Sequence, residues 1–214
     1  MALLTEKNII YPETDGKPMA ESTKQFDYIV LIKEGLEAVF ADHAEVFVAG
    51  DLFWYPVEGN PRIVYAPDVM VVFGRPKGDR KSYLQWQEAN IAPQVVFEIL
   101  SASNSAAEMT RKFSFYQRFG VEEYYVYDPE ANELLGWQRN ESIFEEIETM
   151  QGWKSPLLNI RFELDKENLL LFRADGLRFR TYTELSKERE EALLKMEKLA
   201  QKLRELGINP DAIA

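Results

Sequence analysis

The stretch FEILSASNSAAEMTRKFSFYQRFGVEEYYVYDP, from Phe97 to Pro129, predicts a strand, a helix and another strand in direct succession. The first strand begins earlier, in QVVFEILS, and its apolar residues occupy both faces, which is typical of a strand buried on both sides. The helix is expected from about Ala106 to Phe119, with Gly120 where a glycine commonly follows a helix. EEYYVYD is the next strand. Strands joined by a helix usually run parallel with a right-handed crossover, so this stretch predicts part of an α/β sheet.

Two charged residues interrupt these apolar elements. Glu98 lies in the middle of the first strand, where an ionised carboxylate is costly unless a cation or hydrogen-bond donors meet it. At about 100° per residue, Lys112 falls on the apolar arc of the helix with Met109, Tyr116 and Phe119. Its ammonium group is therefore expected to point toward the sheet. Glu98 and Lys112 should lie close together, either as an internal salt bridge or as part of a site.

A third charged residue distinguishes these two interpretations. Asp68 follows Pro67 in APDVMVVF, and strand alternation places it on the same face as Met70 and Val72. The salt-bridge interpretation leaves Asp68 unexplained. Two carboxylates on neighbouring strands can instead hold a divalent cation, which activates water and shields the charge that develops on a phosphate. A nearby ammonium then stabilises the transition state, so the three residues together indicate a metal-dependent phosphodiesterase.

The rest of the chain extends the same architecture. Helical spacing of apolar residues predicts a helix from about Ser22 to Phe40. The segments EVFVAGDLFWYP and IVYAPDVMVVFG are expected to be strands that can form a hairpin, and a short helix is expected at 83–89. After residue 133, four more strands are expected, in LLGWQR, IFEEIE, LLLFRA and RFRTY. The predicted fold class is α/β, with a mixed sheet flanked by helices.

Composition limits the chemistry that is available. The chain has 214 residues, of which 46% are hydrophobic, so we expect a globular protein. The segment MALLTEKNII does not have the pattern of a signal peptide and no apolar run reaches membrane-spanning length, so we expect no signal peptide, no membrane association and a cytoplasmic location. The absence of cysteine excludes disulfides and zinc–thiolate sites, and a single histidine, His43, excludes multi-histidine metal sites. Carboxylates are left as metal ligands, and they favour Mg²⁺ or Mn²⁺.

Charge is distributed unevenly along the chain. The net charge of −11 argues against a nucleic-acid partner. However, residues 61–120 carry eight basic and five acidic side chains, whereas residues 121–150 carry one basic and nine acidic ones. The basic segment Arg75, Lys77, Arg80 and Lys81 is either a set of phosphate contacts or a solvated loop between strands.

The C-terminal part, residues 181–214, differs in composition from residues 1–180 and is expected to form a separate charged helix. Apolar residues between 182 and 206 recur at alternating spacings of three and four, with many Glu, Lys and Arg residues between them. This pattern is typical of a coiled coil, and we expect the helix to pair with another subunit in a homodimer or higher homo-oligomer. The alternative is a terminal helix that packs on its own domain.

Taken together, three segments resemble the PD-(D/E)XK nuclease superfamily, and more closely its bacterial Uma-type family of restriction endonucleases. They are PDV at 67–69, FEILS at 97–101 and KFSFYQRFGVEEYYVYDP at 112–129. The resemblance extends from YPETDGKPMAES to LRELGINPDAI, which is nearly the whole chain. It implies a restriction-endonuclease-like core, with a mixed sheet and helices on both faces. It also implies that Asp68 and Glu98 are metal ligands, with the backbone carbonyl of Ile99 as a further ligand.

The chain departs from the superfamily pattern at one position. The pattern has a lysine two residues after the second acid, where this chain has Leu100. The Uma-type family takes its lysine from the following helix, and this matches Lys112. Members of the superfamily often carry a glutamate on the first helix, and Glu21 is the matching residue, although it could equally be an ordinary first-turn residue. Glu108 is interpreted as structural, because SAAE at 105–108 matches a helix capping box.

Two functional hypotheses follow. The first is a Mg²⁺- or Mn²⁺-dependent endonuclease that hydrolyses DNA phosphodiester bonds, with Asp68, Glu98, Lys112 and Glu21 in the site and RNA as an open alternative substrate. The second is a catalytically silent scaffold or regulatory protein that has the nuclease fold and assembles through its C-terminal helix. Leu100 and the net charge of −11 favour the second hypothesis.

Overall fold

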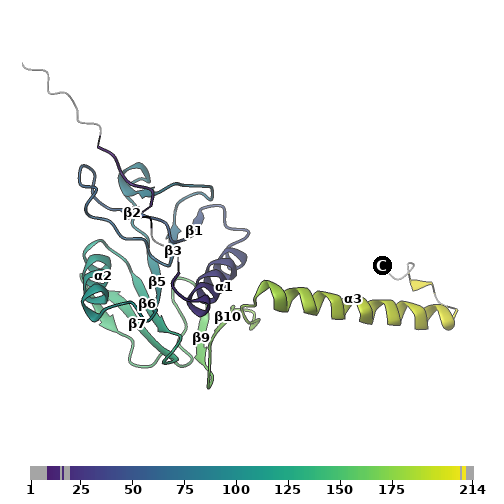
Figure 1. Ribbon diagram of the computed structural model, residues 1–214. Helices are drawn as coiled ribbons and strands as arrows, with labels where there is room; N and C mark the ends of the chain where they lie inside the picture. Colours follow the sequence, from purple (N-terminus) through teal and green to yellow (C-terminus); the bar gives the residue numbers. More distant parts are fainter. Residues whose placement is uncertain (1–8, 15, 17–19, 208, 211–214) are drawn as a thin grey trace, which may run out of the picture. The chain divides into compact units, whose positions relative to one another are not determined.

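The computed structural model describes residues 9–14, 16, 20–207 and 209–210, and a six-stranded mixed sheet is its main feature (Figure 1). The strand order is β1-β3-β5-β6-β7-β8. Neighbouring strands are antiparallel, except that β5 and β6 are parallel. The strands are β1 (Val46–Gly50), β3 (Val69–Phe73), β5 (Val95–Ile99), β6 (Glu123–Asp128), β7 (Glu133–Asn140) and β8 (Ile143–Glu146).

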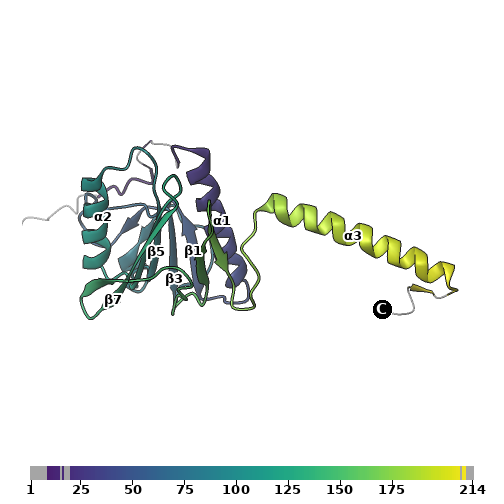
Figure 2. The same cartoon turned by 90° about the horizontal axis from the view of Figure 1, so that it is seen from below.

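Helices cover both faces of this sheet (Figure 2). On one face, α1 (Thr23–Val39) buries Ile29, Ile32 and Leu36 against strand residues such as Val71 and Phe97. On the other face, α2 (Ala106–Arg118) buries an aromatic surface against the alternate residues of the same strands. Strand side chains alternate between faces, so strands that are apolar on both sides fill two cores. The predicted α/β class, with a mixed sheet flanked by helices, is confirmed.

Local sequence signals explain where both helices begin. The side chain of Ser22 caps α1 by accepting a hydrogen bond from the N–H of Gln25, and Ser105 caps α2 by accepting from the N–H of Glu108. A serine at this position satisfies one of the N–H groups that have no partner within the helix. After α2, Gly120 adopts a φ of 92°, a left-handed conformation that glycine tolerates better than other residues. The chain can therefore turn directly from α2 into β6.

The first two predicted strands are shorter than expected. The segment EVFVAGDLFWYP breaks at Asp51, whose φ is 48°, and forms β1 and the short β2 (Trp54–Tyr55). β2 pairs in parallel with β4 (Tyr83–Leu84), and a single turn of 3₁₀ helix at Gln85–Gln87 stands where a longer helix was predicted. The expected hairpin partner of β1 is β3, and the two are antiparallel neighbours.

The C-terminal strands also differ in part from the prediction. β10 (Leu169–Phe172) was predicted, and it pairs with β9 (Arg161–Leu164), which was not. The predicted strand RFRTY contributes one isolated bridge, between Phe172 and Arg178. β9 was hard to locate because it has only four residues and only one of them, Phe162, is buried in the core on the side of α1.

A second compact unit begins at Arg180, after a first unit that ends at Phe179. It contains α3 (Tyr182–Glu205), which begins with a complete capping box between Thr181 and Glu184. None of its helical side chains is buried. Among the described residues, no helix is both long and apolar enough to cross a membrane.

Candidate active site

Two acidic side chains meet where β3 begins beside the end of β5. These strands are antiparallel and Val69 pairs with Phe97, so one further step of the same register aligns Asp68 with Glu98. Met70 and Val96 lie two residues away along their strands, and both belong to the core on the side of α2. Because side chains alternate, Asp68 and Glu98 also face α2.

Asp68 is largely buried, with 9% of its surface exposed. Its Oδ2 accepts a hydrogen bond of 2.6 Å from the backbone N–H of Ile99. Burial raises the pKa of Asp68 well above its usual value, and the charge of Glu98 raises it further. The Lys112 charge and the Ile99 hydrogen bond lower that pKa but do not compensate. Without a bound cation, the aspartate is therefore poorly stabilised in its ionised form.

Glu98 is even less exposed, at 2%, and both of its oxygens accept hydrogen bonds from α2. Lys112 Nζ lies 2.7 Å from Oε2, so the expected closeness of these two residues is confirmed. Burial lowers the pKa of Lys112, but the charges of Glu98 and Asp68 outweigh this effect and raise it overall. The lysine therefore remains a cation beside the two acids.

Sequence reasoning missed a second partner of Glu98. The hydroxyl of Tyr116 donates to Oε1 over 2.5 Å, and burial raises the pKa of this hydroxyl well above its usual value, so it is a neutral donor. Tyr116 lies four residues after Lys112 and hence on the same face of α2. This spacing is a signal that could have identified it, but the apolar surroundings of Tyr116 in the sequence indicate only a core residue.

The fully buried Tyr124, on β6, lies beside Tyr116, with ring centroids 5.1 Å apart. Burial and then the charges of Glu98 and Asp68 raise its pKa well above the usual value. Among the described residues its hydroxyl has no hydrogen-bond partner, although buried hydroxyls normally have one. The acid pair therefore has two neighbouring tyrosines, and one of them donates to Glu98.

The first helix contributes a further polar link that was not predicted. The Gln25 side chain is buried, and its Nε2 donates to the carbonyl oxygen of Ile99 over 2.8 Å. Its Oε1 accepts from the backbone N–H of Glu21 over 2.9 Å. The carboxylate of Glu21 accepts from the hydroxyl of Ser101 over 3.0 Å. Gln25 thus connects two residues from the predicted site, Glu21 and Ile99.

A cleft of about 760 Å³ gives access to this region. Asp68, Lys112 and Glu21 line it, and Gln25 and Glu108 also contribute to its wall. Glu108 therefore faces the cleft, although its backbone N–H makes the predicted capping contact. Among the described lining residues, five are acidic and one is basic; the acidic ones are Glu13, Glu21, Asp51, Asp68 and Glu108. A phosphate that enters this cleft meets a strongly negative wall unless cations accompany it.

The donor atoms fit a small, hard cation. Asp68 and Glu98 offer carboxylate oxygens and Ile99 offers a carbonyl oxygen, which are the ligand types that Mg²⁺ and Mn²⁺ prefer. Each carboxylate oxygen can accept more than one contact, so the bonds from Lys112 and Tyr116 leave coordination capacity on Glu98. Among the described residues, no cluster of three or more His, Cys, Asp or Glu side chains is suited to hold a metal ion. The described residues therefore offer two carboxylates and one backbone carbonyl as oxygen ligands.

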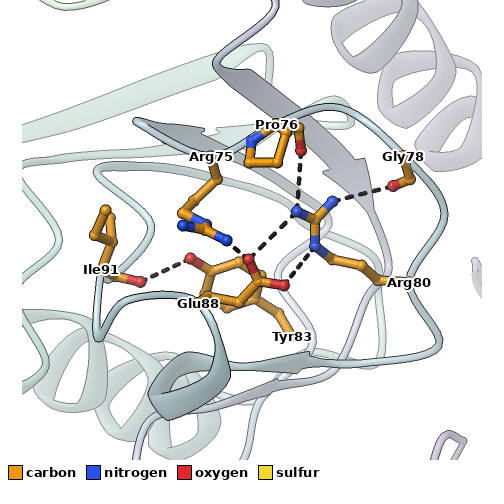
Figure 3. A network of polar contacts seen from close by, with 7 residues as sticks. All are labelled: Arg75, Pro76, Gly78, Arg80, Tyr83, Glu88 and Ile91. Carbon is orange, nitrogen blue, oxygen red and sulfur yellow. Dashed lines mark hydrogen bonds and ion pairs between the residues drawn. The ribbon is translucent and has the colours of Figure 1, made fainter.

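Two residues of the basic segment belong to an internal network (Figure 3). Arg75 and Arg80 each place Nε 2.7 Å from an oxygen of Glu88, and these contacts lower the pKa of Glu88. The Tyr83 hydroxyl donates to the carbonyl of Ile91 next to this network. These arginines are used to order the loop that follows β3.

The other two residues of the segment differ from each other. Lys77 donates to the carbonyls of Phe40 and Ala41, just after the end of α1. The side chain of Lys81 is 81% exposed and lies 3.3 Å from Glu13. The two alternatives, phosphate contacts and a solvated loop, stay untested; Arg75, Lys77 and Arg80 bond within the fold, and the exposed Lys81 pairs with Glu13.

Comparisons with known proteins agree with this architecture. A crystal structure titled "putative nuclease belonging to DUF820", from Anabaena variabilis ATCC 29413, is similar to this chain, with a TM-score of 0.50. The two are 16% identical, and the match covers 69% of this chain and 82% of that one, so it supports the nuclease-like fold alone. No curated protein matches the chain.

A family comparison is more specific. Residues 15–167 match the Uma2 family, described as "Putative restriction endonuclease". Because the match covers more than half of the chain, the chain belongs to this family. The resemblance given by PDV, FEILS and the segment from Lys112 to Pro129 is thereby confirmed.

Proposed function

We propose that this protein is an endonuclease that hydrolyses DNA phosphodiester bonds in the cleft beside Asp68 and Glu98, with Mg²⁺ or Mn²⁺ as cofactor. One observation carries the proposal: the antiparallel register of β3 and β5 aligns two buried acids, and an ammonium from α2 lies on one of them. An internal salt bridge needs one acid, whereas this arrangement has two. The nuclease family of residues 15–167 supports the same reading.

Asp68, Glu98 and the carbonyl of Ile99 would hold the cation. When bound, the cation supplies a water of lowered pKa and neutralises charge on the scissile phosphate. Asp68 is held in place by the N–H of Ile99, and Glu98 by Tyr116 and Lys112. These bonds fix the acids before a substrate arrives, as an efficient site requires.

Lys112 has a role besides holding Glu98. Its side chain lines the cleft, so its positive charge reaches the space that a phosphate would enter. It can stabilise the negative charge that accumulates on the phosphate oxygens in the transition state. This role would compensate for Leu100, which replaces the superfamily's usual lysine.

Cleavage of supercoiled plasmid DNA by the purified protein tests the proposal, with Mg²⁺, Mn²⁺ or EDTA present. We expect metal-dependent nicking by the wild type and none by Glu98→Ala. A structured RNA of similar length, assayed in parallel, decides between DNA and RNA. Equal cleavage by wild type and Glu98→Ala would show that the activity does not belong to this site.

One observation favours a second candidate function, a nuclease-fold scaffold without turnover. Both oxygens of Glu98 and the carbonyl of Ile99 already have partners within the protein, which a purely structural network would also require. A wild type that binds neither metal nor nucleic acid, yet folds and self-associates, would support this alternative.

A further inference from the structure

The helix α3 carries an apolar stripe that no other described residue of its own unit covers. Its a positions are Tyr182, Arg189, Met196 and Leu203, and its d positions are Leu185, Ala192, Leu199 and Leu206. Of these side chains Leu199 is 66% exposed, Met196 67% and Leu185 52%. Twenty-four residues span about 36 Å, which is long enough for a stable coiled coil. A water-exposed stripe of this length favours a partner helix.

We propose that the partner is α3 of a second copy of this chain, and that the two helices run antiparallel. The proposal goes beyond the nuclease function and is independent of it. The proposal rests on the charged residues in and beside the stripe. Their positions are unfavourable in a parallel pair and favourable in an antiparallel pair.

A parallel pair of α3 helices would place like charges in its core, and it would lack compensating ion pairs at the flanking positions. In register, Arg189 would meet Arg189 of the second copy inside the a layer, and two guanidinium groups would be forced together. Ion pairs between g and e positions normally compensate in parallel coiled coils. Here the e positions are Ser186, Leu193 and Ala200, which carry no charge.

An antiparallel pair resolves both problems. In the register that sets Ala192 opposite Met196 of the second copy, Leu185 packs against Leu203 of the second copy. Arg189 then lies opposite Leu199. The arginine stem can then cover the leucine while the guanidinium reaches water.

The flanking positions fit the same arrangement. On one flank, Glu188 approaches Lys202 of the second copy, and the two-fold axis generates this attraction twice. On the opposite flank, Leu193 meets Leu193 of the second copy, which buries a leucine that is 47% exposed in the single chain. One like-charge pair, Lys195 with its own copy, opposes the arrangement, but long exposed side chains can separate at little cost.

The chain offers a matched control for association. Leu194 is 56% exposed but lies on the side of α3 opposite the stripe, whereas Leu199 lies within it. Sedimentation equilibrium on the full chain should show a wild-type dimer, and Leu199→Glu should weaken dimerisation by more than about tenfold. Leu194→Glu should leave the dimer unchanged. A monomeric wild type, or equal effects of the two substitutions, would overturn the proposal.

Orientation is tested by cross-linking, which is unambiguous because the natural chain contains no cysteine. Leu185→Cys and Leu203→Cys proteins are oxidised separately and as an equimolar mixture. In the antiparallel dimer the disulfide should form mainly in the mixture, between the two different variants. In a parallel dimer these positions would lie about 27 Å apart. Each variant would then cross-link to itself, and that result would contradict the proposed orientation.

Discussion

Two buried glutamates on neighbouring strands have opposite surroundings. Glu98 on β5 is bonded to the ammonium of Lys112 and the hydroxyl of Tyr116, beside Asp68 and an open cleft. Glu123 on β6 is completely buried, and its donors among the described residues are neutral: the hydroxyls of Ser155 and Tyr125 and the N–H of Leu157. Burial raises the pKa of Glu123, and its hydrogen bonds lower it only in part.

The difference teaches which buried acids indicate a site. A carboxylate that is satisfied by neutral donors holds segments of the chain together, here β6 and the turn around Ser155. A carboxylate that shares its space with a second acid and a lysine retains unbalanced charge, which an incoming ligand can use. The raised pKa of Glu123 alone would have marked a residue of the structural network as a candidate site, so geometry is the better criterion.

The largest expected effect follows from removing the ammonium group of Lys112, which lies beside Glu98. Lys112→Met should reduce DNA cleavage by about 10²–10³-fold, because a positioned donor to the transition state is lost. The metal-induced rise in melting temperature should persist, since lysine does not hold the metal. Single-turnover cleavage and thermal unfolding of the same samples measure both properties. Full activity in Lys112→Met would make the lysine purely structural.

The second prediction concerns the structural glutamate. Glu123→Gln places an amide N–H group among donors that need an acceptor, which should lower the free energy of unfolding by about 1–3 kcal/mol. Urea denaturation measures this change, and cleavage by the folded variant should equal that of the wild type. Loss of activity with unchanged stability would reverse the roles that we assign to the two glutamates.

The two tyrosines beside the acid pair allow a smaller and sharper test. Tyr116→Phe removes a donor from Glu98 and should weaken Mn²⁺ binding by about tenfold, as is typical when a group that orients a ligand is lost. Tyr124→Phe removes a hydroxyl without a partner among the described residues and should leave Mn²⁺ binding unchanged. Isothermal titration with Mn²⁺ compares them. Equal effects would mean that the Tyr116 bond does not position Glu98.

The smallest expected effect is on DNA binding by the basic segment, which comprises Arg75, Lys77, Arg80 and Lys81. Lys81→Glu should weaken DNA binding and reduce the slope of log affinity against log salt by about one, because one phosphate contact is lost. Arg80→Ala should chiefly destabilise the loop that Glu88 organises. Fluorescence anisotropy at several salt concentrations separates these outcomes. An unchanged slope for Lys81→Glu would show that the segment is only a solvated loop.

Much of the site was accessible from sequence, because it lies on elements with strong periodic patterns. Glu98 and Lys112 conflict with the apolar character of β5 and α2, and that conflict located them. Tyr116 and Gln25 were missed because both fit their helices without conflict, and their partners come from distant segments. The break at Asp51 was also missed; its N–H donates to the carbonyls of Pro67 and Asp68, which lie on a distant segment of the chain.

The central claim is that Asp68 and Glu98 form a metal site whereas Glu123 does not, and thermal unfolding with and without Mn²⁺ tests it most directly. Because folding raises the pKa of Asp68, ionisation above its unfolded pKa costs stability in the metal-free protein. Metal-free Asp68→Asn should therefore be at least as stable as the wild type at neutral pH. Mn²⁺ at about 100 times its dissociation constant should stabilise the wild type by about 2.7 kcal/mol.

Asp68→Asn and Glu98→Gln should lose that stabilisation, and Glu123→Gln should keep it. A wild type whose melting temperature does not respond to Mn²⁺, together with a Glu98→Gln variant several kcal/mol less stable, would contradict the account. Glu98 and Lys112 would then be a buried ion pair that joins β5 to α2.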